Sequence, residues 1–540
     1  MKRYLLIISL LLSVQLLAQP PILKRQNSYG GSKDDLGKVI RRTRDKGFIV
    51  GGTTFSPEVP GNHGYENCWV KKFDKKGKEV WSKCYGGSYI DELNDIIPTK
   101  DNGYIIAGYA GSDDGDATGN PDPISGSAWI FKIDSSGNIK WSRFYGGSEV
   151  DDANSIINTA DGGYIFAGQS ASADGDVPHN QGAYDLWVVK LDISGNIQWS
   201  KTYGGYDQEY CRTIKQVEGD GYIIGAATTS SELPGHHNQD DPGTDIYILK
   251  IAPDGSIQWQ KCFGGSFMEN GGDILPLKND GYIFVGTTSS VDGDVLNSHN
   301  PGDDDGIYDL WLVKISLKGV IQWQKCYGGY DLDYGNSIEK TSDGGYVMTG
   351  FTSSNDGDVS GNHGGYDAWV LKVDSLGKLK WQKCFGGTKD EYASSITPDL
   401  NNGDYVFAGK SNSKNGDCTK NYGLSDMWVV RLGDSANTFS ETNAGSNLIA
   451  KENENALKVY PNPTQNNITV SFFAESKKRY SIIVYDLNGK EIMKKQVQYE
   501  PGLNKINLNL NNFSNGTYFI KLYNEGSLVT QKKIIKQSNH

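Results

Sequence analysis

Short apolar runs alternate with turn residues along residues 19–431, and the pattern returns about every 60 residues. The clearest copy begins at Asp151 and has apolar segments within residues 155–157, 164–168, 185–191 and 197–203, separated by Asp-Gly, Gly-Gly and Ser-Gly-Asn turns. Tight hairpin turns need positive φ angles, which Gly and Asn adopt readily. Each copy is therefore predicted to be a four-stranded antiparallel meander.

Aromatic residues mark the third and fourth predicted strands of each copy. The third strands carry Trp69, Trp129, Trp187, Tyr247, Trp311, Trp369 and Trp428, and the fourth carry Trp81, Trp141, Trp199, Trp259, Trp323 and Trp381. Successive markers lie 58 to 64 residues apart. Four-stranded repeats of this length are typical of propeller blades, so residues 19–432 are predicted to form an all-β, seven-bladed β-propeller; an open solenoid is the alternative.

The N-terminal residues are predicted to complete the last blade. Seven third strands are marked but only six fourth strands, and the segment from Leu23 to Tyr29 ends in the same aromatic-Gly-Gly sequence as each fourth strand. Pairing of this segment with the last third strand would close the ring and leave no free sheet edge. An open solenoid would not need the exchange.

A basic residue recurs three positions after each third-strand aromatic, and we expect these residues to form structural ion pairs or to snorkel along apolar surface, rather than to bind a ligand. They are Lys72, Lys132, Lys190, Lys250, Lys314, Lys372 and Arg431. The seven Cys are an odd number, so one thiol at least has no partner within the chain. Cys84, Cys262, Cys326 and Cys384 share one repeat position and are predicted to be small core residues. A bridge between Cys68 and Cys84 across one hairpin remains open.

Composition and charge narrow the functional classes. The chain has 67 Gly and 12 Trp but 5 Met, as expected of a turn-rich β protein, and its net charge is −12. An acidic body would repel nucleic acid, so we expect no nucleic-acid partner. Residues 1–18 have the basic start and short apolar run of a signal peptide, with a retained anchor as the alternative. We expect no membrane span once this segment is removed.

The last part of the chain has a different composition, with 12 Lys or Arg and 5 Asp or Glu from Leu457 onward. It contains Tyr460-Pro461-Asn462-Pro463, Tyr485-Asp486-Leu487-Asn488-Gly489, Gly516-Thr517-Tyr518 and Lys532-Lys533-Ile534-Ile535-Lys536. In order and spacing these resemble the type A C-terminal sorting domain of the type IX secretion system of Bacteroidota. The repeat likewise resembles those of secreted Bacteroidota proteins with Asp-Gly-Gly-Tyr elements.

The resemblance implies that residues 457–540 form a small β-sandwich that interacts with the type IX secretion machinery. It also implies a protein that is released or attached to the outer cell surface. Residues 433–456 are predicted to be a linker because they are rich in Ser, Asn, Glu and Ala. An ordinary adhesive sandwich is the alternative for the tail.

A carboxylate stands four residues after the second Gly of every repeat, at the start of the innermost predicted strand. The seven are Asp35, Asp91, Asp151, Glu209, Glu269, Asp333 and Glu391. A ring of acids could bind a polar ligand, but a side chain present in every blade more often caps a loop, and we favour that structural role.

Pairs of Asp around a Gly fill the loops between the second and third strands. They are Asp114 and Asp116, Asp174 and Asp176, Asp292 and Asp294, and Asp356 and Asp358. Closely spaced carboxylates suit Ca²⁺, which takes about six to eight oxygen ligands, although a purely turn-forming role is the alternative. Calcium is the one cofactor that the sequence suggests.

Tyr residues in the loops of the same face differ between blades: Tyr89, Tyr206, Tyr210, Tyr330, Tyr334 and Tyr392. Tyr rings beside carboxylates suit a sugar, and packing between loops is the alternative. We therefore expect a non-enzymatic module that binds a glycan or a surface protein. The alternatives are an endoglucanase-like polysaccharide-degrading enzyme and a structural adhesin without a small ligand; no catalytic residue is assigned.

Overall fold

The computed structural model describes residues 20–217, 219, 221–237, 243–299, 307–399, 403–433, 458–460, 467–474, 478–486, 490–499, 502–524 and 527–537. The predicted signal peptide (1–18), all of the predicted linker except Gly433, and residues 461–463 and 487–489 of the tail motifs lie outside them. The chain divides into two compact units, residues 1–439 and 440–540.

The first unit consists of four-stranded antiparallel sheets, each built from consecutive strands except for the sheet that includes the N-terminal strand. The first three sheets are β2 (Asp35–Arg42), β3 (Phe48–Thr54), β4 (Asn67–Phe73) and β5 (Glu79–Tyr85); β6 (Asp91–Pro98), β7 (Tyr104–Ala110), β8 (Ser127–Ile133) and β9 (Ile139–Tyr145); and β10 (Asp151–Asn158), β11 (Tyr164–Ser170), β12 (Asp185–Leu191) and β13 (Ile197–Tyr203). A short 3₁₀ segment, η1 (Gly115–Ala117), lies between β7 and β8.

Three further sheets follow in the same order. They are β14 (Glu209–Gln216), β15 (Tyr222–Thr228), β16 (Asp245–Ile251) and β17 (Ile257–Phe263); β18 (Glu269–Leu277), β19 (Gly281–Thr288), β20 (Asp309–Ile315) and β21 (Ile321–Tyr327); and β22 (Asp333–Lys340), β23 (Tyr346–Thr352), β24 (Asp367–Val373) and β25 (Leu379–Phe385).

The remaining sheet joins the two ends of the repeat region. Its order is β1-β28-β27-β26, formed by β26 (Glu391–Asp399), β27 (Asp404–Ser411), β28 (Asp426–Gly433) and β1 (Ile22–Tyr29). The predicted pairing of the N-terminal segment is confirmed, since Tyr29 lies opposite Met427 and Ser28 opposite Trp428. Gln26 Oε1 also accepts a hydrogen bond of 3.0 Å from the indole of Trp428.

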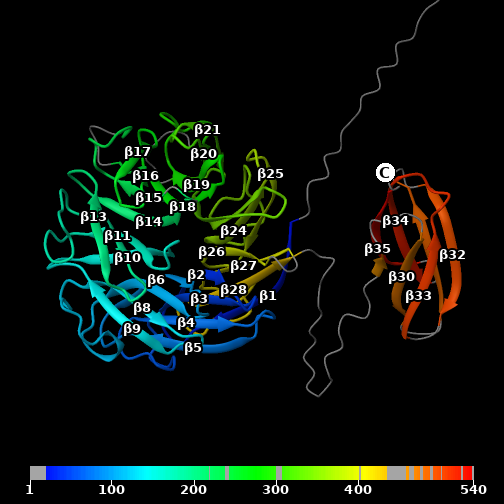
Figure 1. Cartoon of the computed structure of the whole chain (residues 1–540), viewed down its shortest axis with the longest axis horizontal. Coiled ribbons are helices and arrows are strands. Elements are labelled where there is room, and N and C mark those ends of the chain that lie inside the picture. Colours follow the sequence, from blue (N-terminus) through cyan, green and yellow to red (C-terminus); the bar gives the residue numbers. More distant parts are fainter. Residues whose placement is uncertain are drawn as a thin grey trace, which may run out of the picture. The chain divides into compact units, whose positions relative to one another are not determined.

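The first strands of the sheets face a common centre (Figure 1). Each of β2, β6, β10, β14, β18, β22 and β26 contacts the first strand of the following sheet, and β26 contacts β2. Repeated four-stranded sheets arranged in this way form a β-propeller-like fold. No helix within the described ranges is long and apolar enough to cross a membrane.

The hydrophobic cores lie between successive sheets. One core, for example, joins Val188 of β12 to Ile224 of β15 and Leu249 of β16. Tyr side chains at the ends of fourth strands tie the sheets together, because Tyr85 and Tyr145 donate hydrogen bonds of 2.7 and 2.5 Å to Gly carbonyls of the next sheet. Both faces of most sheets are therefore buried, as the apolar runs require.

The ion pairs predicted for the third-strand basic residues are confirmed. Lys132, Lys190 and Lys314 contact Asp101, Asp161 and Asp280 at 2.6 to 2.7 Å. Further pairs are Lys72–Asp45, Lys372–Asp343 and Arg431 with Asp399 and Asp404. Lys250 donates a hydrogen bond of 2.6 Å to the side chain of Gln258. These contacts fasten the turn between the first and second strands to the third strand.

All seven Cys are free and buried. The open alternative of a Cys68–Cys84 bridge is wrong, because Cys84 lies opposite Trp69 while Cys68 lies opposite Tyr85. Neighbouring positions along a strand point to opposite faces of the sheet, so the two sulfur atoms are directed apart.

The second unit has two antiparallel sheets that share one hydrophobic core. One sheet has the order β29 (Lys458–Tyr460), β30 (Asn467–Ala474), β33 (Gly502–Asn509). The other has the order β32 (Glu491–Tyr499), β31 (Lys478–Tyr485), β34 (Gly516–Asn524), β35 (Ser527–Lys536). Ile468 and Leu508 from the first sheet and Val484 and Ile520 from the second are buried together.

Candidate functional sites

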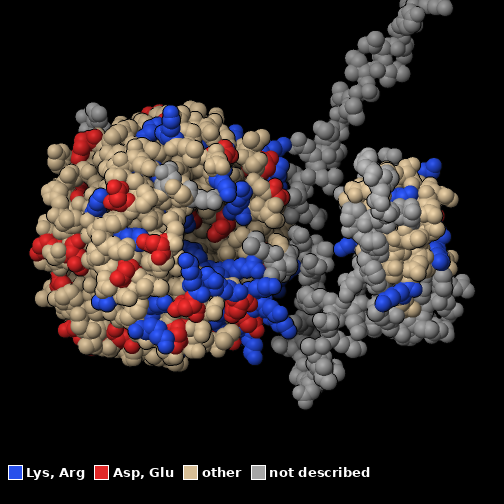
Figure 2. Space-filling model, viewed as in Figure 1, with Lys and Arg blue, Asp and Glu red and all other residues tan. Residues whose placement is uncertain are grey.

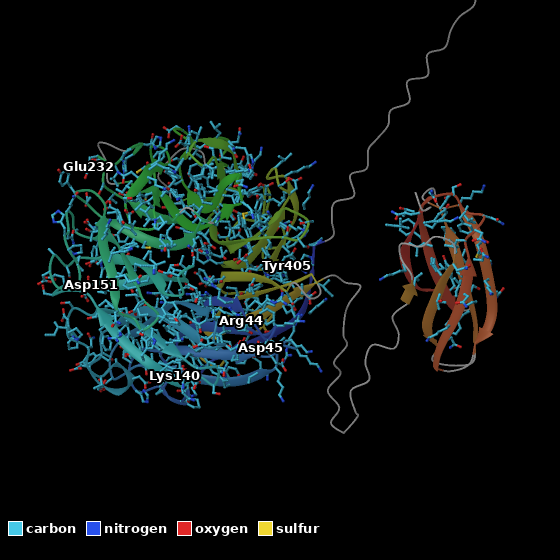
Figure 3. The ribbon with its side chains drawn as sticks, in the orientation of Figure 1. Arg44, Asp45, Lys140, Asp151, Glu232 and Tyr405 are labelled. Carbon is cyan, nitrogen blue, oxygen red and sulfur yellow. The ribbon has the colours of Figure 1, made fainter. Side chains whose placement is uncertain are left out.

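The seven repeated carboxylates begin the first strands and are completely buried. Asp151, labelled in Figure 3, accepts hydrogen bonds from the amide of Gly147 at 2.7 Å and from the hydroxyls of Ser170 and Ser172. The other six accept the equivalent glycine amide at 2.7 to 3.0 Å. They therefore hold the Gly-Gly loop against the second strand, which is the structural role favoured by their strict repetition, and they line no exposed surface.

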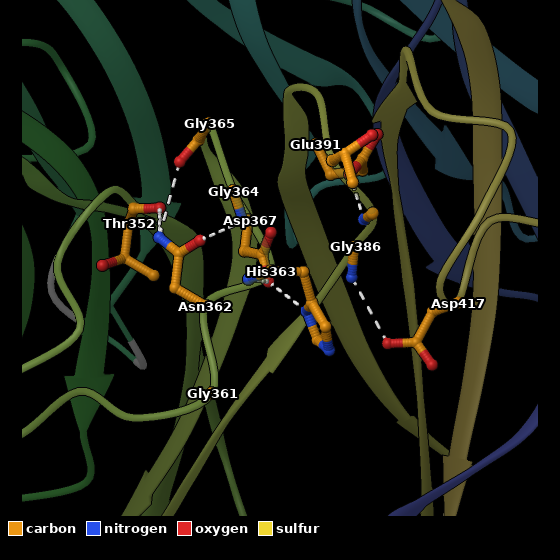
Figure 4. Close-up of polar contacts among 12 residues, drawn as sticks. Thr352, Gly361, Asn362, His363, Gly364, Gly365, Asp367, Gly386, Glu391 and Asp417 are labelled. Atoms are coloured by element: carbon orange, nitrogen blue, oxygen red, sulfur yellow. Dashed lines mark hydrogen bonds and ion pairs between the residues drawn. The ribbon is translucent and has the colours of Figure 1, made fainter.

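A second buried carboxylate, not singled out in the sequence, lies beside the repeated acid at five junctions between sheets. It is the first residue of the third strand: Asp185, Asp245, Asp309, Asp367 and Asp426. Asp367 accepts hydrogen bonds from His363 (Figure 4). Glu391 accepts one from the amide of Gly387. Asn67 and Ser127 occupy this position at the other two junctions. The recurring Asp before the third-strand aromatic was the available sequence signal.

The loops that carry paired Asp residues have turn-forming contacts. Asp174 Oδ1 accepts the Ser148 amide at 2.8 Å, and Asp114 Oδ1 accepts the Ser88 amide at 2.7 Å. The second Asp of each loop makes a different contact, because its backbone amide donates to a glycine carbonyl. In the same loop as Asp174, the amide of Asp176 donates to Gly146 O at 2.9 Å.

The remaining pairs repeat this pattern, with Asp292 and Asp356 accepting amides and Asp294 and Asp358 donating theirs to glycine carbonyls. Among the residues that the structure describes, no three His, Cys, Asp or Glu side chains form a group suited to a metal ion. Calcium binding stays a prediction, and the turn contacts explain these residues without it.

The six Tyr residues fall into two groups. Tyr89, Tyr206 and Tyr330 follow the Gly-Gly pairs and are 67 to 78% exposed, each in a different loop between two sheets. Tyr210, Tyr334 and Tyr392 are the second residues of β14, β22 and β26, where they are half-buried. Only the second group lies on the innermost strands.

Two of these first-strand residues join an aromatic cluster that spans neighbouring sheets. Tyr334 stacks on Phe351 at 4.7 Å, and Phe351 contacts Tyr392 at 4.5 Å between ring centroids. Tyr308 and Tyr366 extend the cluster, and Lys410 Nζ lies 4.4 Å from the Tyr392 ring centroid. All five rings are half-buried, so they pack against one another and leave part of their aromatic surface accessible to solvent.

The equivalent positions on β6 and β10 are acidic. Glu92 forms a 2.6 Å ion pair with Lys38, while Asp152 Oδ1 accepts a 2.9 Å hydrogen bond from Asn94. Burial raises the pKa of Asp152 to about 6. This end of the first strands thus carries the aromatic cluster on β22 and β26 and two carboxylates on β6 and β10.

A polar cavity of about 110 Å³ lies among the first strands. Each first strand contributes to the lining, with Lys38, Asp95, Asn154, Arg212, Asp273, Asn336 and Ser395 in strand order. Arg41–Asp95 and Lys215–Asp273 ion pairs of 2.9 and 2.8 Å cross between strands in it. Arg212 is exposed and has no carboxylate partner among the described residues. The sequence did not indicate this cavity, because a register shift in every first strand turns two consecutive residues toward the centre.

Comparison with known proteins informs mainly the second unit. Residues 458–537 match the family model of the secretion system C-terminal sorting domain. The predicted resemblance of the tail is confirmed over this range. The sorting domain implies export by the type IX secretion system and an extracellular or cell-surface location.

The larger unit has more distant relatives. The regulatory protein FlaEY of Caulobacter vibrioides is 22% identical over 388 residues, which cover 66% of this chain and 40% of that protein. The chain thus spans less than half of that relative's length. Among solved structures, puromycin hydrolase is 11% identical, with a TM-score of 0.43, over 83% of this chain and 60% of its own.

The NanB sialidase from Streptococcus pneumoniae is 10% identical, with a TM-score of 0.38, over 77% of this chain and 71% of its own. Neither likeness carries an argument about function.

Proposed function

We propose that this chain is an exported, seven-bladed β-propeller that binds a glycan without hydrolysing it. The binding face is the end of the ring where the first strands begin. The C-terminal sorting domain, which we take to be a β-sandwich, delivers the propeller through the type IX secretion system. The signal peptide at residues 1–18 directs the preceding export step.

The observation that carries this proposal is the aromatic cluster of Tyr308, Tyr334, Phe351, Tyr366 and Tyr392. The fold does not require an aromatic ring at the position of Phe351, because only one of the equivalent residues is aromatic. These residues are Thr53, Tyr109, Gln169, Ala227, Thr287 and Lys410. Aromatic faces cover the apolar C–H surface of a sugar, and nearby polar groups bind its hydroxyls. Side chains that differ between otherwise equal blades are those expected to contact a ligand.

The acidic side of the same end supplies the polar groups. Glu92 and Asp152 occupy equivalent positions on neighbouring first strands, across from the cluster in strand order. A carboxylate accepts hydrogen bonds from sugar hydroxyls, so a chain of sugars could contact rings on one side and acids on the other. A protein partner would use the same rings as apolar anchors.

A polysaccharide-degrading enzyme is the second candidate, and one observation favours it. Asp152, whose pKa burial raises to about 6, could donate a proton, and Glu92, which is ion-paired with Lys38, supplies a second carboxylate on the neighbouring strand. Glycoside hydrolysis requires a proton donor and a second carboxylate. The two candidates differ in whether sugar is released.

Glycan-array binding and reducing-sugar release by the mature chain test both candidates. We expect binding without release, and a loss of at least tenfold in affinity in Tyr334→Ala and Tyr392→Ala. Ile193→Ala, an apolar truncation at an exposed position in a third-to-fourth-strand turn, should bind normally. Sugar release that disappears in Asp152→Asn would overturn the non-enzymatic proposal, and a blank array with loss of cell attachment on deletion would indicate a structural adhesin.

A further inference from the structure

Basic side chains gather at the other end of the first sheet, where its two hairpin turns lie. Arg44 and Lys46 occupy the turn between β2 and β3, and Lys75, Lys76 and Lys78 the turn between β4 and β5. In an antiparallel meander these turns share one edge. Arg25 of β1 joins them, donating to the carbonyl of Lys76 at 3.1 Å. We call these six residues the basic patch; Figure 2 shows Lys and Arg gathered on this face.

The charges of the basic patch are not neutralised locally. All six side chains are exposed, and within the described part of the chain none forms an ion pair with a carboxylate. The two acids of these turns are engaged elsewhere: Asp45 contacts Lys72 at 2.8 Å, and Asp74 accepts the amides of Lys76 and Lys78 at 2.8 and 2.9 Å. The patch therefore keeps several positive charges within a protein whose net charge is −12.

The fold does not require these lysines. The equivalent turn of the next sheet reads Asp134-Ser135-Ser136-Gly137-Asn138, and Asp134 accepts the amides of Ser136 and Asn138 just as Asp74 accepts those of Lys76 and Lys78. Lys46 has a φ of 68°, and Asn102 fills the equivalent position with a φ of 65°. Positive φ favours Gly or Asn, so Lys46 is present at some conformational cost.

An apolar hollow adjoins the basic patch. It has a volume of about 30 Å³ and is lined by Tyr29, Phe48, Phe73, Val406 and Val429, with Arg25 and Arg431 at its sides. A hollow of this size has room for one water-sized group, such as a methyl group. Cations beside an apolar recess suit a chain that carries both acidic groups and apolar substituents.

We propose that the basic patch binds an anionic polysaccharide, whose carboxylate or sulfate groups contact the lysine and arginine side chains and whose apolar substituent enters the hollow. This site lies at the opposite end of the first strands from the aromatic cluster and is independent of the proposed glycan site there. The surrounding acidic surface limits attraction to the patch. Binding is therefore local and weakens with salt, because exposed charges are screened beyond about 8 Å at physiological ionic strength.

The test uses the mature full-length chain with polygalacturonate and dextran sulfate as probes and neutral dextran as the reference. The triple variant Lys75→Ser, Lys76→Ser, Lys78→Asn copies the turn at residues 134–138. It should melt within about 2 °C of the parent and lose at least tenfold in affinity for both probes. Lys46→Asn, which copies Asn102, should lose about threefold.

A charge-matched control removes three cations from the third-to-fourth-strand hairpins of other sheets: Lys140→Ser, Lys318→Ser and Lys380→Ser. It should bind both probes within twofold of the parent. An equal loss in the two triple variants would overturn the proposal, since attraction would then follow net charge alone. Failure of the parent chain to bind either probe, binding of neutral dextran at equal strength, or tighter binding of a DNA duplex than of either polysaccharide would also overturn it.

Discussion

Asp367 Oδ1 and Glu391 Oε2 approach one point from two sides, lying 2.6 and 2.7 Å from the position that a Cβ on Gly386 would take. Both carboxyl groups are completely buried, and Asp367 Oδ1 has no hydrogen-bond partner. At the equivalent junction of the first two sheets, Asn67 Nδ2 and Asp91 Oδ2 each lie 2.7 Å from the same position on Gly86. There the amide donates to two carbonyl oxygens at 2.8 and 2.9 Å. A carboxyl oxygen at the position of Asn67 Nδ2 can donate an equivalent hydrogen bond only if it is protonated, because an ionised oxygen only accepts.

Raising the pH is therefore expected to destabilise the propeller. Burial raises the pKa of Asp367 to about 6, and that of Asp333 and Glu269 to about 7. A raised pKa means that the folded state holds protons that the unfolded state releases, so this stability is full below about pH 4 and is lost as pH rises through 6 to 7. Hydrogen bonding to Asp245 raises the pKa of His237, which acts with the same sign.

The groups that face Asp367 are His363 before β24, Glu391 on β26, and the buried thiols of Cys384 and Cys418. Thermal melting at pH 5 and pH 8 should give the lower midpoint at pH 8. Asp367→Asn, which copies Asn67, should regain about 1–3 kcal/mol at pH 8 and little at pH 5. Equal midpoints at the two pH values would contradict the prediction.

Acid should destabilise the protein only at much lower pH. Lys132, Lys190 and Lys372 hold the pKa values of Asp101, Asp161 and Asp343 at about 2, even though partial burial opposes this. A lowered pKa gives stability that is present above about pH 4 and is lost as pH falls toward 2. Chemical denaturation across pH 2 to 8 should therefore show a maximum near pH 4 to 6, and Lys190→Met should flatten its acid limb.

The seven thiols should be unreactive in the folded protein. All are buried, and burial raises the pKa of Cys84 to about 12, so thiolate is scarce at neutral pH. A thiol reagent that absorbs on reaction should detect seven groups in denaturant and none in native buffer. A fast-reacting group under native conditions would show that one of these cores opens.

The fold could be predicted from the sequence because the strand period, the turn residues and the marker aromatics indicate the same four strands in every copy of the repeat. The closing strand could be predicted because the sequence marks one fewer fourth strand than third strands. The hydrogen bond between Gln26 and Trp428, which lie far apart in the sequence, confirms it. The third-strand ion pairs were accessible for the same reason: Lys190 and its counterparts recur at fixed positions.

The candidate sites were harder to predict from the sequence, because they depend on contacts between residues that are far apart along the chain. The register shift between Ala153 and Ser155 turns both Asn154 and Ser155 toward the central cavity, which a regular alternation would not predict. The partnership of Asp367 with Glu391 joins two different sheets, so neither residue alone indicated it. Lys75 and its neighbours were visible in the sequence, but their meaning depends on Arg44 lying at the same sheet edge.

Calcium binding can be separated from turn formation by one substitution. Asn415 Oδ1 accepts the Thr388 amide at 3.0 Å, as Asp174 Oδ1 accepts the Ser148 amide at 2.8 Å. Asp174→Asn should therefore keep the melting temperature in chelator within about 2 °C of the parent. If Ca²⁺ binds this loop, the midpoint of the parent rises with added Ca²⁺ and that rise is smaller in the variant. No rise in the parent chain would remove the calcium prediction.

Removal of the N-terminal strand should open the ring. Deleting residues 19–31 would leave β28 with an unpaired edge and would remove the acceptor of the Trp428 indole, together with the 2.7 Å ion pair between Lys24 and Asp404. We expect loss of cooperative folding, or a melting temperature lower by more than 10 °C. The milder Gln26→Ala leaves the strand in place and should cost about 1–2 kcal/mol, because one partly buried donor loses its partner. A truncated chain that melts like the parent would show that β1 is dispensable, and the last sheet would then have to be stable with three strands.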